Sequence, residues 1–204
     1  MAAGVALAVL VAGCAQESGE AEVEMATAEP TVMEINEASF GCIQDMTAVR
    51  GFFVSSLTGD LDATVAVANA EEGVYPVGSV VQLVPTEAMV KREAGFSDIS
   101  HDWEFFELGV SPEGTTIDVR GTSEAVNRFG GNCLTCHLQA EPQYDLICEQ
   151  THGCDPIPVT PVMARAIQKT DPRCEPMALT DEETQALQAL AAFAVGDAED
   201  PATE

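Results

Sequence analysis

The sequence predicts an α+β fold in which an antiparallel β-sheet is flanked by a few helices. Between residues 46 and 120, short β-branched and aromatic segments alternate with turns that contain proline and glycine. This spacing is typical of strands that pair with their neighbours in order. Between residues 160 and 196, apolar residues recur at helical spacing after helix-start signals. The length of 204 residues suits one domain with appendages.

The start of the chain has the features of an exported lipoprotein. An apolar run at residues 5–11 is too short to cross a bilayer but suits the core of a secretory signal. The sequence Ala12-Gly13-Cys14 after it resembles a bacterial lipobox. We therefore expect a signal peptide over residues 1–13 and lipidation of Cys14; an ordinary signal peptide that contains a cysteine is the alternative. Ala15 is not aspartate, and by resemblance to Gram-negative lipoproteins this indicates an outer-membrane anchor facing the periplasm.

Acidic residues dominate the next segment and the whole chain. Residues 14–37 carry seven glutamates among small polar residues, which predicts a flexible tether. The net charge of −26 makes nucleic acid and anionic lipid surfaces poor partners. A basic redox partner protein would be attracted, although an acidic, solubilising surface is the explanation of the charge that we favour. The only membrane contact that we expect is the lipid anchor.

We expect a single domain over residues 38–196, followed by a disordered acidic tail over residues 197–204. Residues 46–57 read as one strand, and Asp60 as the N-cap of a helix that continues to Gly73. Two further strands, residues 79–84 and 88–92, form a hairpin through Pro85.

The strand expected at residues 102–108 has two apolar faces. Trp103 and Phe105 point to one side, and Phe106 and Leu108 point to the other, so we expect burial on both sides. A turn at residues 111–114 leads to a strand at residues 115–120. Prolines prevent regular helix until residues 162–167, and a capping box at residues 180–183 begins a last helix that ends at Gly196.

A pentapeptide near the C-terminal end of this predicted sheet carries the clearest chemical signal. It reads Cys133-Leu134-Thr135-Cys136-His137, which is the C-x-x-C-H pattern of c-type haem attachment. In that pattern each cysteine adds to one vinyl group of the porphyrin, and the histidine ligates the iron. We therefore expect a metal-binding, cytochrome c-type protein with one covalent haem c, held by Cys133 and Cys136 with His137 as the axial ligand.

Three other interpretations of the pentapeptide remain open. Half of a zinc site would need a second pair at zinc spacing, and Cys148, His152 and Cys154 do not repeat the first. A thioredoxin-like redox pair would need a surrounding βαβ unit, which the sequence does not predict. A plain disulfide between the two cysteines is the third.

The remaining cysteines predict two disulfides. The chain has seven cysteines, and lipid and haem would account for three of them. The other four allow three pairings and suit an oxidising compartment. We favour Cys148–Cys154, because a short glycine-containing loop can close locally, and this leaves Cys42–Cys174.

Four segments, taken in order, resemble the cytochrome P-460 family, which includes cytochrome c′-beta. They are residues 76–80, 89–91 and 102–105 and the C-x-x-C-H pentapeptide, and the resemblance covers about residues 50–147. It implies a β-sheet haem domain that binds or converts a small nitrogen species, NO or hydroxylamine, with electron transfer to a partner. Members that oxidise hydroxylamine carry a cross-linked lysine upstream, and this chain has no lysine before Lys91.

The residues around the haem are less defined by the sequence. Three side chains could occupy the sixth position of the iron, although packing or solvent exposure explains each of them as well: Met163, Met177 and Glu141. Three aromatic residues could form the wall of a haem pocket or simply fill the sheet core: Trp103, Phe105 and Phe106. Two alternative functions follow, a six-coordinate electron-transfer cytochrome and a disulfide-stapled lipoprotein without haem.

Overall fold

The computed structural model describes Met1 and residues 33–196 of the chain. The expected signal peptide, the lipidation site Cys14, most of the expected tether and the acidic tail lie outside the described residues. The domain begins before residue 38, where we expected its boundary, because Ile35 is already buried in the core. Among the helices of the described residues, none is both long and apolar enough to cross a membrane.

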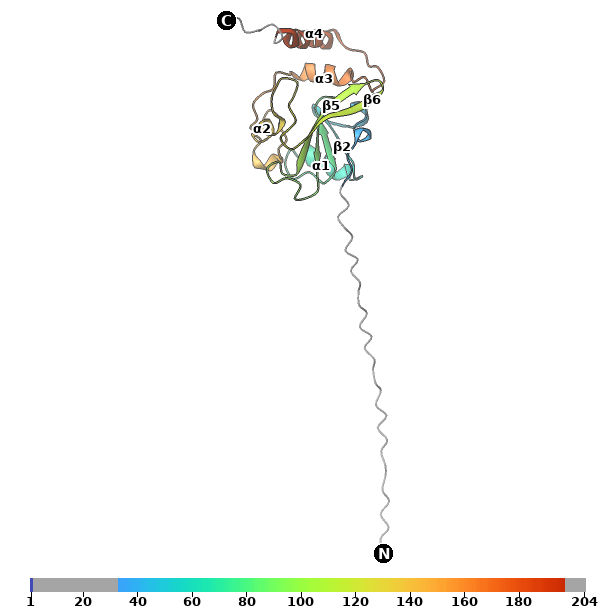
Figure 1. Ribbon diagram of the computed structural model, residues 1–204, viewed down its shortest axis with the longest axis vertical. Helices are drawn as coiled ribbons and strands as arrows, with labels where there is room; N and C mark the ends of the chain where they lie inside the picture. The colour runs from blue at the N-terminus through green and yellow to red at the C-terminus, as the bar shows by residue number, and fades with distance from the viewer. Residues whose placement is uncertain (2–32, 197–204) are drawn as a thin grey trace. The chain divides into compact units, whose positions relative to one another are not determined.

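The centre of the domain is a six-stranded antiparallel sheet in which every strand pairs with its neighbour in the sequence (Figure 1). The strands are β1 (Thr47–Val49), β2 (Phe52–Ser56), β3 (Ser79–Gln82), β4 (Glu87–Lys91), β5 (Trp103–Ser111) and β6 (Gly114–Gly121). With the helices around it, this meander confirms the predicted α+β fold.

The segment that we predicted as a single strand, residues 46–57, is a hairpin of β1 and β2. Arg50 and Gly51 form the turn, and Arg50 has a left-handed φ of 53°. Thr47 pairs with Val54, and Val49 with Phe52, across this turn. The single-strand prediction is wrong because a two-residue hairpin loop interrupts the apolar run only briefly.

Strand β5 separates two hydrophobic clusters, as its two apolar faces predicted. Trp103 and Phe105 belong to the cluster that also contains Leu134 from the pentapeptide. Phe106 and Leu108 belong to the cluster on the other face. Burial on both faces fixes the direction of each β5 side chain, because a slip of one residue would exchange the two faces.

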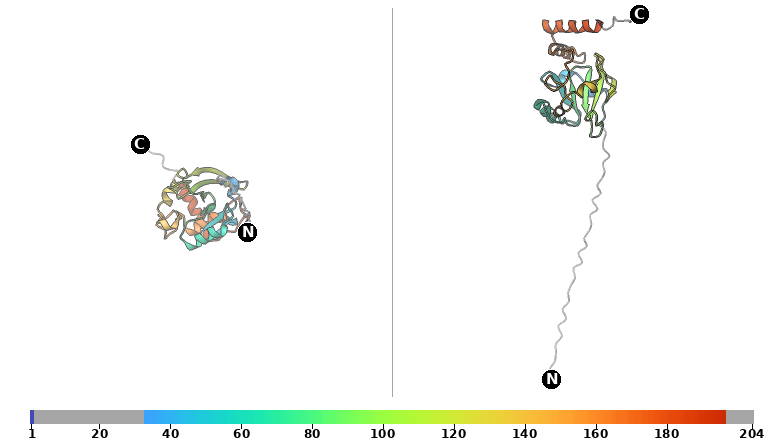
Figure 2. Two further views of the ribbon diagram at one scale, coloured as in Figure 1. Left: turned by 90° about the horizontal axis from the view of Figure 1, so that it is seen from below. Right: turned by 90° about the vertical axis from the view of Figure 1, so that its left-hand side faces the viewer.

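Within the described residues, four α-helices accompany the sheet: α1 (Leu61–Ala70), α2 (Cys133–His137), α3 (Pro161–Lys169) and α4 (Asp181–Gly196). Helices α3 and α4 pack against each other, as Figure 1 and the right-hand view of Figure 2 show. Pro161 is the first residue of α3, where its missing N–H costs no hydrogen bond. The predicted capping box of α4 is present, since Thr180 Oγ1 accepts from Glu183 N and Glu183 Oε2 accepts from Thr180 N.

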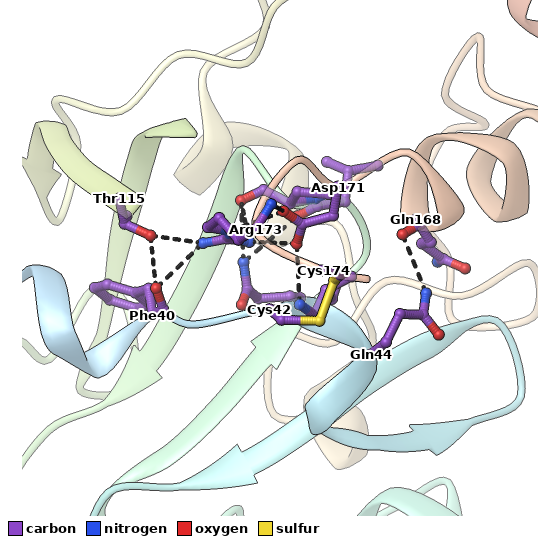
Figure 3. A network of polar contacts seen from close by, with 12 residues as sticks. Phe40, Cys42, Gln44, Thr115, Gln168, Asp171, Arg173 and Cys174 are labelled. Carbon is purple, nitrogen blue, oxygen red and sulfur yellow. Dashed lines mark hydrogen bonds and ion pairs between the residues drawn. A yellow bond between two sulfur atoms is a disulfide. The ribbon is translucent and has the colours of Figure 1, made fainter. Parts of the chain in front are cut away.

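A disulfide between Cys42 and Cys174 joins the first part of the domain to the segment after α3, as predicted. Figure 3 shows the polar network around it. Asp171 accepts a hydrogen bond from the backbone N–H of Ile43 at 3.0 Å and pairs with Arg173 at 2.7 Å. The guanidinium of Arg173 also donates to the hydroxyl of Thr115 in β6 at 2.8 Å. The disulfide and the buried ion pair of Asp171 and Arg173 therefore lie at the same place, where the first part of the domain is joined to the segment after α3.

Candidate functional site

The C-x-x-C-H pentapeptide forms the single-turn helix α2. Asn132 caps it, because its side-chain oxygen accepts a hydrogen bond from Thr135 N at 3.0 Å. Leu134 anchors the helix in the core cluster that contains Trp103 and Phe105. The helix thus holds the two thiols and the imidazole of His137 at the edge of the core, where all three are partly buried.

The thiols of the pentapeptide are unpaired. Of the six cysteines in the described part of the chain, four form the disulfides Cys42–Cys174 and Cys148–Cys154, and both pairings were predicted. Cys133 and Cys136 carry free thiols. The plain disulfide that was one interpretation of the motif is therefore not what the structure contains.

The environment of Cys133 makes it a poor redox thiol. Burial, which has the largest effect, and the nearby carboxylates of Glu87 and Glu107 together raise the pKa of Cys133 to about 12. Redox-active cysteines need the opposite shift, because the thiolate is the nucleophile. This protonated thiol argues against the thioredoxin-like interpretation.

The imidazole of His137 is oriented by a backbone carbonyl. Its Nδ1 atom lies 2.6 Å from the carbonyl oxygen of Leu146. A carbonyl oxygen only accepts hydrogen bonds, so Nδ1 donates, and the lone pair of the neutral ring is on Nε2. Burial lowers the pKa of His137, and the Leu146 carbonyl only partly opposes this effect. The ring is therefore neutral at pH 7 and has the free Nε2 that a metal ligand requires.

The three aromatic residues named from the sequence have different surroundings. Phe105 packs on His137, with their ring centroids 5.2 Å apart. Trp103 is fully buried and donates from Nε1 to the backbone carbonyl of Asp145 at 2.8 Å. Phe106 lies on the other face of the sheet, where its ring is 5.0 Å from that of Phe40. Of the three, Phe105 is the residue whose ring lies beside the imidazole of His137.

The three candidates for a sixth iron ligand lie on separate segments. Met163 is buried on α3, and Met177 is exposed in the connection between α3 and α4. Glu141 is exposed and accepts a hydrogen bond from Gln143 Nε2 at 2.8 Å. The location of these three side chains does not identify any of them as the sixth ligand of the iron.

The short disulfide Cys148–Cys154 lies beside α2. The sulfur of Cys148 is 3.6 Å from the carbonyl oxygen of Cys136. Within this disulfide loop, His152 accepts through its carbonyl a hydrogen bond from Glu141 N at 2.8 Å. The loop therefore braces the segment that follows His137.

The expectation of a metal-binding site needs correction. In the part of the chain that the structure describes, no three His, Cys, Asp or Glu side chains are grouped so that they could hold a metal ion. The metal-binding classification was therefore wrong, since the described residues do not build an ion site from their own side chains alone. It was drawn from a motif that offers one imidazole and two thiols, which is a smaller ligand set than structural metal sites use.

The sequence did not identify several residues that hold His137 in position. Asp145 and Leu146 shape the turn that presents the Leu146 carbonyl, and Lys91 and Tyr75 both contact Asp145. One signal was available, because a lysine that ends the apolar strand sequence Met89-Val90 needs a buried partner. The identity of that partner was not readable from the sequence.

Comparison with known proteins identifies no relative of this chain. No family model matches it, and neither a curated protein nor a solved structure does. The cytochrome P-460 resemblance therefore remains a proposal.

Proposed function

We propose that this chain is a disulfide-stapled domain whose helix α2 attaches one haem c. Cys133 and Cys136 would form the thioether bonds, and His137 would supply Nε2 to the iron. The observation that carries the proposal is the chemical state of the pentapeptide. Both thiols are free although the other four described cysteines are paired, and the bond from Nδ1 to Leu146 leaves Nε2 available.

Apolar side chains next to the helix support the same proposal. Val126, Phe129 and Leu138 flank the pentapeptide in the sequence and are 39%, 40% and 46% exposed. A porphyrin has a large apolar ring that could cover such surface.

The residues of the chain would have separate tasks at this site. Cys133 and Cys136 bind, His137 ligates, the Leu146 carbonyl holds the proton on Nδ1, and Phe105 limits rotation of the imidazole. The haem would supply one-electron chemistry and the binding of small diatomic molecules. By the resemblance to cytochrome c′-beta, the small molecule would be NO or a related nitrogen species, and the absence of lysine before Lys91 disfavours hydroxylamine oxidation.

A second candidate function needs no haem. The two disulfides directly support a stapled domain of the kind found in oxidising compartments, and they support export only to that extent. Of the features in the proposal, the two disulfides have the most direct support from the structure. In this case the two thiols on α2 are structural, in agreement with the raised pKa of Cys133.

Haem attachment in an exporting bacterial host that assembles c-type haem separates the two candidates. We expect haem to remain bound to the purified full chain after denaturation, in a one-to-one ratio measured as the pyridine haemochrome. The double variant Cys133→Ser/Cys136→Ser should lose it. The matched control Cys148→Ser/Cys154→Ser removes two nearby cysteines and should retain it.

Two results would redirect the proposal. If the wild-type chain carries no covalent haem, the haem proposal is wrong and the stapled domain without haem is supported. If haem is attached but the reduced spectrum ignores CO and NO, the chain is a six-coordinate electron-transfer protein, and small-ligand binding is excluded.

A further inference from the structure

The backbone that orients His137 has an unusual conformation. Asp145 and Leu146 are consecutive non-glycine residues with left-handed φ values of 48° and 65°. Such a conformation costs free energy for each L-residue and persists only where the surroundings impose it. The carbonyl of Leu146 is the hydrogen-bond acceptor of His137, so the strained turn is directly linked to the imidazole.

The surroundings of Asp145 hold this conformation through four hydrogen bonds. Lys91 Nζ lies 2.8 Å from each carboxylate oxygen of Asp145. The backbone N–H of Tyr75 donates to Oδ2 at 2.8 Å, and Trp103 Nε1 donates to the backbone carbonyl at 2.8 Å. These hydrogen bonds therefore fix both the side chain and the backbone carbonyl of Asp145.

The ion pair is deeply buried. The side chains of Lys91 and Asp145 are 6% and 3% exposed, and the third contact of the ammonium is the carbonyl of His101 at 2.7 Å. The ammonium also lies 5.0 Å from the ring centre of Trp103. A buried ion pair is weak support for overall stability, because desolvation offsets most of the attraction. Its better attested use is to select one arrangement, and here that arrangement is the turn at residues 145–146.

The two donors come from rigid elements. Lys91 is the last residue of β4, and Trp103 is the first residue of β5, directly opposite it in the sheet register. The turn is therefore fixed to the sheet. Sites held on strands are more precise than sites held on loops alone.

We infer that Lys91, Asp145 and Trp103 are positioning residues that hold the imidazole of His137 in its Nδ1–H tautomer through the Leu146 carbonyl. The role of that imidazole as an iron ligand rests on the proposed function. The positioning itself does not, because it can be measured in the protein without haem.

The test uses the full chain, produced without haem and labelled with 15N. Long-range 1H–15N spectra assign the tautomer of each histidine, and we expect wild-type His137 to be in the Nδ1–H form. In Asp145→Asn, which removes the ion pair, we expect a mixture of tautomers and exchange of the Nδ1 proton with water at least about tenfold faster. His152 makes a similar bond to the carbonyl of Ile147 at 2.7 Å and serves as an internal reference.

A matched control separates positioning from general loss of stability. Asp171→Asn removes another buried carboxylate, which pairs with Arg173 in the network of Figure 3. This variant should lose comparable stability and leave the His137 tautomer unchanged. If Asp145→Asn does not fold, Trp103→Phe removes the Nε1–H donor and retains an aromatic ring, and it should shift the tautomer in the same direction.

The inference is overturned if the folded variant keeps the wild-type tautomer and exchange rate, or if Asp171→Asn changes them equally. In the haem-loaded chain, Asp145→Asn should also shift the reduction potential, whereas Asp171→Asn should not. A chain that takes up no haem would contradict the proposed function and leave the tautomer result intact.

Discussion

The Nδ1 atom of His137 lies 2.6 Å from the carbonyl oxygen of Leu146, nine residues further along the chain. A backbone acceptor is neutral and does not titrate, in contrast to the charged carboxylate that often orients a ligating histidine. The bond therefore fixes the ring without adding a charge. We expect a site of this kind to keep its ligand geometry over a wide pH range.

Removal of the imidazole should separate attachment from ligation. In His137→Ala we expect haem to remain covalently bound, because the thioether bonds involve only the cysteines, and the visible spectrum to change. The control Arg165→Ala alters an exposed side chain on α3 and should keep the wild-type spectrum. An unchanged spectrum in His137→Ala would rule out His137 as the axial ligand.

The thiol of Cys133 should be slow to react in the protein without haem. Because burial and the nearby carboxylates raise its pKa to about 12, almost none of it is thiolate at pH 7. Its alkylation by iodoacetamide should be at least about a hundredfold slower than that of a free cysteine, whose pKa is about 8.5. The rate should still rise with pH above 9. Peptide mass mapping measures it, and the urea-unfolded chain provides the reference; fast modification at pH 7 would support a redox role instead.

The two disulfides should contribute unequally to the free energy of unfolding. They join residues 132 and 6 positions apart, and the loop-entropy model gives about 5 and about 2.4 kcal/mol. We therefore expect Cys42→Ala/Cys174→Ala to be destabilised about twice as much as Cys148→Ala/Cys154→Ala. Urea denaturation measures both differences. The reverse order would mean that packing around α2, rather than chain entropy, dominates.

Asp171 should make the domain sensitive to acid. Burial alone would raise the pKa of Asp171, but the guanidinium of Arg173 and the backbone N–H of Ile43 lower it below the ordinary value. A carboxylate with a lowered folded-state pKa stabilises the fold above the unfolded pKa of about 4, and this contribution is lost as the pH falls toward the folded pKa. Asp171→Asn should be less stable at pH 7 and lose less stability between pH 5 and 3. Equal acid slopes for both proteins would contradict this expectation.

Local patterns were sufficient for most of the sheet. The β-branched segments, the two apolar faces of β5 and the capping box of α4 depend on neighbouring residues, and the structure has them as predicted. The hairpin at Arg50 was missed because apolar residues continue on both sides of its two-residue turn. The pairing of cysteines was readable because only a few combinations existed.

The reactive groups of the site were predictable from the sequence, but the residues that hold them in position were not. The spacing of Cys133, Cys136 and His137 is a local chemical pattern. The left-handed conformation at Asp145 depends on Lys91, which is 54 residues earlier in the chain. Such a conformation has no signature in a non-glycine sequence, because it is imposed by tertiary contacts rather than by local preference.

The Cys42–Cys174 bridge also constrains how the domain is made. Synthesis proceeds from the N-terminus, so Cys42 exists long before its partner, and Cys133, Cys136, Cys148 and Cys154 all appear between them. If the cysteines were oxidised in the order in which they are synthesised, Cys42 would pair with one of these four thiols. The native bond between Cys42 and Cys174 would then not form at first. On that route, the native bond forms only after the first bonds are reshuffled by thiol–disulfide exchange. We therefore expect an isomerase to raise the yield of the native pairing.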